Sequence, residues 1–186
     1  MLINTKSEPR FAHLARRDDV ASLLAPGAIG IELGVAEGEF ASRVLAHTRI
    51  GLLYGVDMYA GDRGHDLDQY KRALRRLMPF AGRSALLHMR FDQALDLFAD
   101  ESLDFIYVDG YAHTGEEGGA TFHDWWPKLK RGGIFAGDDY DQAAWPDVVS
   151  NVNAFLAGNG LTGYLIPNVE SDVAYCKYPT WFTIKP

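Results

Sequence analysis

The sequence lacks the features that mark disulfide-linked, zinc-binding and membrane-spanning proteins. Its 186 residues include one cysteine, Cys176, which excludes an internal disulfide framework and a cysteine-based zinc site. No apolar run reaches the ~18 residues that a membrane span needs. The first residues, MLINTKSEPRF, contain no apolar core of a signal peptide. We therefore expect a cytoplasmic protein that has no membrane partner.

Basic residues are also in short supply. The chain has 18 Lys and Arg residues against 25 Asp and Glu residues, which gives a net charge of −7. Nucleic-acid binding depends on a positively charged surface, so we expect no nucleic-acid partner. With 47% hydrophobic residues, the chain is predicted to form a single domain over residues 1–186.

A glycine-containing stretch at residues 31–40, IELGVAEGEF, follows an apolar run and leads into apolar residues at helical spacing. Strand, glycine turn and helix in this order open a doubly wound α/β domain, where a ligand lies over the end of the first strand. The spacing, Glu32-x-Gly34-x-x-x-Gly38, lacks the third glycine of a dinucleotide-binding fingerprint. The carboxylate of Glu32 favours a cationic ligand over a phosphate.

Asp57 follows the second predicted strand, 19 residues after Gly38. An acid at this position can accept hydrogen bonds from both hydroxyls of a ribose. Taken alone, Asp57 could equally be a loop carboxylate or a helix cap. Together with the glycine turn, it favours the ribose interpretation.

Strand-like and helix-like segments alternate along the chain. This alternation predicts an α/β fold with a doubly wound, mostly parallel, seven-stranded sheet. The strands are expected at 28–33, 52–56, 85–89, 103–108, 134–136, 162–166 and 180–184, and the helices between them at 37–47, 66–78, 93–98, 116–130 and 146–157. No helical pattern separates the last two strands, so the final strand is expected to be antiparallel.

An additional helix is expected before the first strand, from Glu8 to Leu24, within an N-terminal helical extension over residues 1–27. It could cover the ligand cleft, form a contact between subunits of a homodimer or higher homo-oligomer, or simply pack on the sheet.

Three carboxylates follow neighbouring segments of the predicted sheet. Asp109 comes after the fourth strand, and Asp138 and Asp139 come after the fifth. If these strands are neighbours, their ends lie about 4.8 Å apart and the carboxylates converge. Like charges at this range repel unless a cation lies between them, and Mg²⁺ prefers oxygen ligands. The sequence favours a Mg²⁺ site, with loop carboxylates, one of them a helix cap, as the alternative.

His113 lies in the loop after the fourth strand, close to the predicted metal site. It could act as a general base, bind the substrate through a hydrogen bond or supply a further metal ligand. A purely structural role carries equal weight.

These stretches resemble class I S-adenosylmethionine-dependent methyltransferases. The most specific part, residues 102–140, reads SLDFIYVDGYAHTGEEGGATFHDWWPKLKRGGIFAGDDY. It is similar to the small-molecule, metal-dependent O-methyltransferase family that includes macrolide-sugar and aminocoumarin-sugar enzymes. That family has an aspartate-glycine pair, a His-Thr/Ser-Tyr-Glu element, a WWP-L-K-x-GG stretch and a GDDY end. The chain departs from it by an extra residue before His113 and by Gly115 in place of tyrosine.

The resemblance implies a Rossmann-like methyltransferase fold and a role for each matching residue. The implied cofactor-binding residues are Glu32, Gly34 and Gly38 at the methionine part, Asp57 at the ribose, Tyr59 at an aromatic position of the family, Arg90, Phe91 and Asp92 beside the adenine, and Asp109. The implied metal ligands are Asp109, Asp138 and Asp139, and the implied catalytic residues are His113 and Asp109.

The implied reaction is transfer of a methyl group from S-adenosylmethionine to a hydroxyl of a small molecule of the sugar or phenol type, assisted by Mg²⁺ or another divalent cation. One alternative is a metal-independent methyltransferase of the same fold with His113 as its base. Another is a domain that binds the cofactor without catalysis.

Overall fold

The computed structural model describes residues 3–4, 11–61, 64–110, 117–167 and 177–186. The predicted catalytic residue His113 and the departure at Gly115 lie outside these residues. Among the described helices, none combines the length and the apolar character that crossing a membrane requires.

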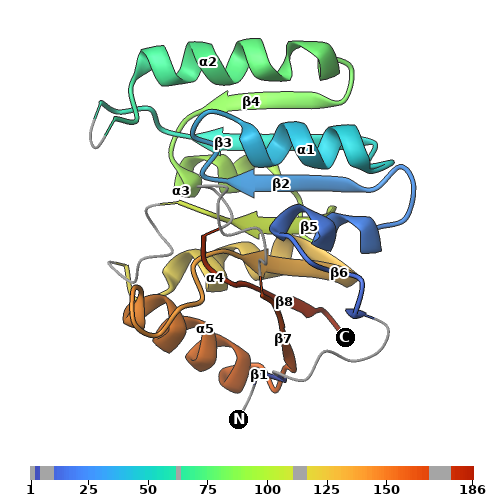
Figure 1. Cartoon of the computed structure of the whole chain (residues 1–186), viewed down its shortest axis with the longest axis vertical. Helices are drawn as coiled ribbons and strands as arrows, with labels where there is room; N and C mark the ends of the chain where they lie inside the picture. Colours follow the sequence, from blue (N-terminus) through green and yellow to red (C-terminus); the bar gives the residue numbers. More distant parts are fainter. Residues whose placement is uncertain (1–2, 5–10, 62–63, 111–116, 168–176) are drawn as a thin grey trace.

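Within the described residues, eight strands form one sheet in the order β1-β7-β8-β6-β5-β2-β3-β4 (Figure 1). They are β1 (Ile3–Asn4), β2 (Ile29–Leu33), β3 (Leu52–Asp57), β4 (Ser84–His88), β5 (Leu103–Val108), β6 (Leu129–Gly137), β7 (Gly163–Ile166) and β8 (Thr180–Ile184). β8 pairs antiparallel with β6 and with β7, and the other pairings are parallel. The predicted fold is confirmed, and the two-residue β1 adds one strand at the edge.

Helices cover both faces of the sheet (Figure 1). One face carries the 3₁₀ helix η2 (Arg17–Leu23), α1 (Glu39–His47) and α2 (Leu67–Leu77), which is followed by η3 (Met78–Phe80). The other face carries α3 (Phe91–Ala94) with η4 (Leu95–Leu97), α4 (Ala120–Trp125) with η6 (Trp126–Lys128), and α5 (Pro146–Gly158).

Side chains of the central strands point alternately to the two faces of the sheet and pack with the helices on each face. Phe105 and Tyr107 of β5 pack with α1 and η2, whereas Ile106 and Val108 pack with α4 and α5. A strand buried on both faces must be apolar throughout, because successive side chains point in opposite directions. This explains the continuous apolar run that made β5 predictable.

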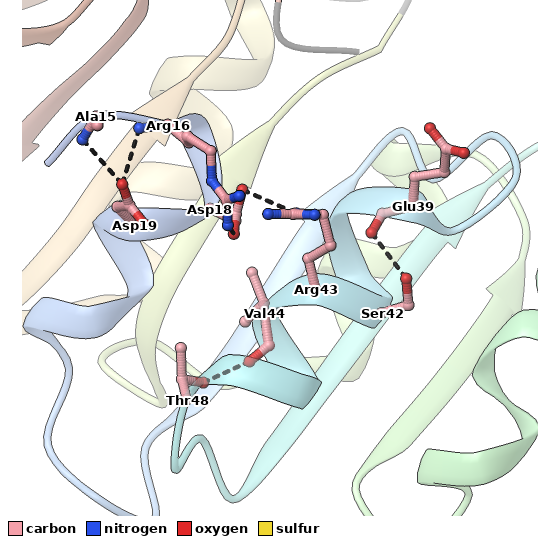
Figure 2. A network of polar contacts seen from close by, with 9 residues as sticks. All are labelled: Ala15, Arg16, Asp18, Asp19, Glu39, Ser42, Arg43, Val44 and Thr48. Atoms are coloured by element: carbon pink, nitrogen blue, oxygen red, sulfur yellow. Dashed lines mark hydrogen bonds and ion pairs between the residues drawn. The ribbon is translucent and has the colours of Figure 1, made fainter. Parts of the chain in front are cut away.

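The N-terminal helix differs from its prediction. In its described part, the expected helix Glu8–Leu24 is not continuous: Phe11 has 3₁₀ geometry, residues 14 and 15 are irregular, and η2 begins at Arg17. The Oδ2 atom of Asp19 accepts hydrogen bonds from the backbone N–H groups of Ala15 and Arg16, each at 2.8 Å (Figure 2). Because a side chain takes these two donors, they do not form the bonds of a continuous α-helix, and the helix starts at the next residue.

The helix predicted over residues 116–130 is also shorter. α4 ends at Trp125, and Pro127 lies in η6 before β6 begins at Leu129. Proline cannot donate the hydrogen bond that would continue an α-helix, and its ring clashes with the preceding turn.

Candidate functional site

The glycine turn between β2 and α1 makes a close backbone contact with the end of β5. Gly34 has a φ of +95°, and a Cβ atom at this residue would lie 1.7 Å from the carbonyl oxygen of Asp109. Gly38, with a φ of +76°, is the N-cap of α1 in the left-handed conformation that glycine adopts without steric cost. Both predicted glycines therefore have a backbone reason to be glycine.

Asp57, at the end of β3, organises this turn. Its Oδ2 atom accepts hydrogen bonds from the backbone N–H groups of Val35 and Ala36, each at 2.9 Å, and its Oδ1 atom accepts one from Tyr59 N–H at 3.1 Å. The Tyr59 hydroxyl donates to the Ala36 carbonyl at 2.9 Å. The structure thus gives Asp57 a role in holding the loop, and the ribose contact stays a prediction.

Glu32 presents a buried carboxylate below the turn. The residue is 0% exposed, and within the described residues neither of its carboxylate oxygens accepts a hydrogen bond. Burial raises the pKa of Glu32 well above its usual value, and the positive charge of Arg17 opposes this shift. A buried carboxylate of this kind is costly unless a ligand pairs with it.

A cavity of ≈ 920 Å³ lies at this edge of the sheet. Every predicted cofactor-binding residue except Gly38 lines it: Glu32, Gly34, Asp57, Tyr59, Arg90, Phe91, Asp92 and Asp109. Beyond them the lining continues through α1, α4 and the segment after β6, with Phe40, Thr121, Asp124, Trp125 and Asp139. Pockets for small molecules span about 300–1,000 Å³, so this one is large for its class.

The three residues predicted to lie beside the adenine, Arg90, Phe91 and Asp92, line the cavity. Arg90 donates from Nε and Nη2 to the two carboxylate oxygens of Asp92, at 2.9 and 2.6 Å, in an exposed ion pair. The ring of Phe91 packs on Gly110, where a Cβ atom would come within 2.8 Å of it. The three residues therefore form a border of the cavity beside the end of β5.

Asp109 and Asp138 converge, but they converge on an arginine. β5 and β6 are parallel neighbours with Val108 opposite Gly137, as the prediction required. Arg17, the first residue of η2, donates from Nη1 to Asp138 Oδ2 at 2.7 Å and from Nη2 to Asp109 Oδ2. One guanidinium thus bridges the two strand ends.

The side chain of Arg17 is buried beside these carboxylates and two aromatic rings. Its side chain is 4% exposed, and its guanidinium carbon lies 5.0 Å from the ring centre of Phe40 and 5.2 Å from that of Tyr107. Burial opposes the charge of Arg17, but Asp109 and Asp138 outweigh it and raise the pKa of Arg17 well above its usual value. The arginine is therefore a permanent cation beside these two rings, which stack on each other with their centroids 4.0 Å apart.

Asp138 is enclosed from both sides. Its Oδ1 atom accepts a hydrogen bond from Thr180 Oγ1 of β8 at 3.1 Å, and its Oδ2 atom accepts the one from Arg17. Burial raises the pKa of Asp138, against the opposing effects of Arg17 and the Thr180 hydroxyl. Asp139 has a φ of +59° and lines the cavity, so two successive aspartates after β6 have different surroundings.

Comparison with known proteins places this geometry in a family. The sequence model of the family described as "Methyltransferase domain" matches residues 31–140, more than half of the chain. The chain belongs to the methyltransferase domain family. The matched segment begins in β2 and ends at Tyr140, so it contains the glycine turn, Asp57, Asp109 and both aspartates after β6.

Solved structures share the methyltransferase fold at low sequence identity. Spermidine synthase from Thermotoga maritima matches 93% of this chain with a TM-score of 0.67 and 15% identity, and the chain spans 58% of that protein. A precorrin-6y C5,15-methyltransferase from Geobacter metallireducens matches 91% of the chain and 86% of its own length, with a TM-score of 0.66 and 13% identity.

An rRNA methylase from Streptococcus thermophilus matches 90% of the chain and 92% of its own length, with a TM-score of 0.63 and 18% identity. At these identities the likeness shows the fold alone, and no curated protein sequence matches significantly. The family membership supports S-adenosylmethionine-dependent methyl transfer in general, without specifying the atom that is methylated.

The predicted magnesium ligands of the methyltransferase do not fit a metal ion in this arrangement. Among the described residues, no group of three or more His, Cys, Asp or Glu side chains is arranged to hold one. The Oδ2 atoms of Asp109 and Asp138, which would face the ion, both accept hydrogen bonds from Arg17 instead. Asp138 is also absent from the cavity lining, which includes Arg17 and Asp139.

Arg17 is the site residue that the sequence analysis missed. Within the predicted N-terminal helix, Arg17 falls three residues from each of two apolar residues, Leu14 and Val20. Both neighbours are buried, so an arginine on the same side must be buried as well. A charged residue at helical spacing on an apolar face was the signal, because such a residue needs a buried partner of opposite charge.

Proposed function

We propose that this methyltransferase transfers a methyl group from S-adenosylmethionine to a hydroxyl oxygen of a small molecule of the sugar or phenol type. The observation that carries the proposal is the single cavity. Its lining runs without a break from Glu32 and Asp57 to Asp109 and Asp139. A donor and an acceptor can therefore lie end to end in it, which in-line displacement requires.

The turn residues fit the donor. Within the described residues, the buried carboxylate of Glu32 has no hydrogen-bond partner and is offered to the positively charged methionine part, and Asp57 lies beside it at the end of β3. Tyr59 and the Arg90–Asp92 border extend the same side of the cavity towards the position expected for the adenine. Gly38, the N-cap of α1, lies outside the cavity lining, between Glu37 and Glu39, which both belong to it.

The residues beyond Asp109 suit the acceptor. Phe40 and Trp125 give the cavity apolar walls against which a sugar or phenol ring can pack, and Asp124 and Asp139 offer oxygen atoms to its hydroxyls. When bound, S-adenosylmethionine supplies the methyl group: a carbon–oxygen bond forms as the carbon–sulfur bond breaks, and the sulfur keeps the electron pair. The hydroxyl proton then needs an acceptor, for which Asp139 and His113 are the candidates.

The test is a product assay with the purified full chain. We expect S-adenosylhomocysteine to accumulate with at least one sugar or phenol acceptor, and mass spectrometry to show that the acceptor has gained one methyl group on oxygen. Asp57→Ala, which loses the hold on the turn, should abolish turnover and weaken S-adenosylmethionine binding. Binding of the cofactor without turnover on any acceptor of either class would contradict the proposal and indicate a non-catalytic cofactor-binding domain.

A further inference from the structure

A guanidinium occupies the position that two acidic strand ends would offer to a metal ion. The Nη1 atom of Arg17 lies 2.7 Å from Asp138 Oδ2, and Nη2 contacts Asp109 Oδ2. A Mg²⁺ ion bound to the same two oxygens would lie about 2.1 Å from each, which is inside the space that the guanidinium fills. The ion and the arginine therefore exclude each other sterically, and their like charges repel.

The remaining oxygen of Asp138 does not offer a second metal position. Asp138 Oδ1 accepts a hydrogen bond from Thr180 Oγ1 at 3.1 Å, on the side towards β8. Both oxygens of this buried carboxylate are thus engaged by the protein itself. A cation that approached from the cavity would meet Arg17 first, because Arg17 lines the cavity and Asp138 does not.

Arg17 is held in place by its own element. Asp18, the next residue, is buried and accepts hydrogen bonds from Arg16 Nη2 at 3.0 Å and from Arg43 Nε of α1 at 3.2 Å (Figure 2). Val20 and Ala21 of η2 are also buried against α1. The guanidinium lies against the stacked rings of Phe40 and Tyr107, so the cation has a built site rather than a surface contact.

We propose that Arg17 is the resident cation of this site and takes the place of a divalent metal at Asp109 and Asp138. Its single positive charge offsets part of the negative charge of the two carboxylates and its hydrogen bonds fix their positions, so the protein binds no divalent cation there. The part of this proposal that concerns turnover rests on the proposed function: methyl transfer then needs no metal.

Binding of Mn²⁺ tests the proposal without any assay of activity. The EDTA-treated full chain is titrated with Mn²⁺ while electron paramagnetic resonance follows the free ion. We expect no stoichiometric binding to the wild type and stoichiometric binding to Arg17→Met, because that variant leaves two carboxylates without a cation. Adding Asp138→Asn to Arg17→Met should remove the gained site. Arg16→Met, from the same segment, should behave as the wild type.

Two results would overturn the proposal. One is stoichiometric Mn²⁺ binding to the wild type that Asp138→Asn removes, because Arg17 would then yield to the metal. The other is absence of Mn²⁺ binding in an Arg17→Met variant whose circular dichroism is native. If Arg17→Met does not fold, the titrations of the wild type and of Asp138→Asn decide, because binding that Asp138→Asn removes would still overturn the proposal.

Turnover in EDTA provides the second readout. We expect the wild type to keep its full rate after chelation, and a rate that falls with EDTA and returns with Mg²⁺ would overturn the metal-independent reaction. Absence of turnover both with Mg²⁺ and with EDTA would count against the proposed function only. The Mn²⁺ titration would still decide whether Arg17 is the resident cation.

Discussion

Glu32 differs from the other acids of the cavity because it is fully buried and lacks a hydrogen-bond partner within the described residues. Its raised pKa means that the ligand-free protein keeps the Glu32 proton to a higher pH than an exposed glutamate would. A cationic ligand beside the carboxylate favours the ionised form and so expels this proton. Proton release on binding is therefore a signature of direct contact.

We predict that S-adenosylmethionine binds more tightly as the pH rises through the weakly acidic range, by at most about tenfold per pH unit. The sign follows because the free protein holds more protons on Glu32 than the complex does. Calorimetric titration in buffers of different ionisation enthalpy measures the released proton. Glu32→Gln should show none from this residue. Equal proton release in the wild type and in Glu32→Gln would contradict the assignment.

A second prediction at the scale of a single residue concerns the stability of a Gly34→Ala variant. A methyl group in Gly34→Ala would overlap the carbonyl oxygen of Asp109, and φ is +95° as well. The variant should lose more than the roughly 1–2 kcal/mol that left-handed backbone alone costs, measured by urea denaturation. Gly27→Ala is the matched control, because its φ is +83° but nothing lies within 4 Å of the added Cβ. Equal losses would show that the contact is unimportant.

At the scale of elements, the stability of η2 depends more on a small network of hydrogen bonds and ion pairs than on the length of the helix. It has seven residues and 3₁₀ geometry, which is intrinsically less stable than an α-helix. Asp18 ties it to α1 through Arg43, and Asp19 holds the preceding backbone (Figure 2). The position of Arg17 therefore depends on its neighbour in sequence.

We predict that Asp18→Ala destabilises the protein by about 1–3 kcal/mol, because Arg43 and Arg16 each lose a charged partner. Amide hydrogen exchange should become faster within residues 17–23 and remain unchanged in β5. Lys71→Ala, which removes the exposed pair with Asp68, should leave the unfolding midpoint unchanged. Unaltered exchange over η2 in Asp18→Ala would show that apolar packing alone holds it.

The bounds of helices and strands were predictable where the spacing of apolar residues followed either the helical or the strand period. β5 and β8 have the predicted bounds, and α2 begins after Asp66 as its capping pattern indicated. A side chain delayed the start of the N-terminal helix: Asp19 takes two backbone donors before η2, and this choice depends on tertiary packing of Arg17 and Asp18. Local propensity does not contain such packing, so the N-terminal helix was predicted too long.

At the scale of the whole molecule, the order of strands in the sheet explains which site residues could be predicted from the sequence. Glu32, Asp57 and Asp109 lie at or just after the carboxyl ends of neighbouring strands, so the rule that ligands bind at this edge brings them together. Arg17 precedes the first strand of this unit and obeys no such rule. Two converging carboxylates require a cation, but the sequence pattern does not say whether the cation is a metal or a side chain.

The bridge between Arg17 and Asp138 spans 121 positions of sequence, and Thr180 follows Asp138 by a further 42. A ribosome makes the arginine long before it makes either partner. The nascent chain can build α1 and the first strands early, but it has no carboxylate from β6 with which to bury Arg17. The bridge from Arg17 to Asp109 and Asp138 therefore forms late in the synthesis and folding of each chain. A chain truncated before β6 would contain Arg17 without Asp138.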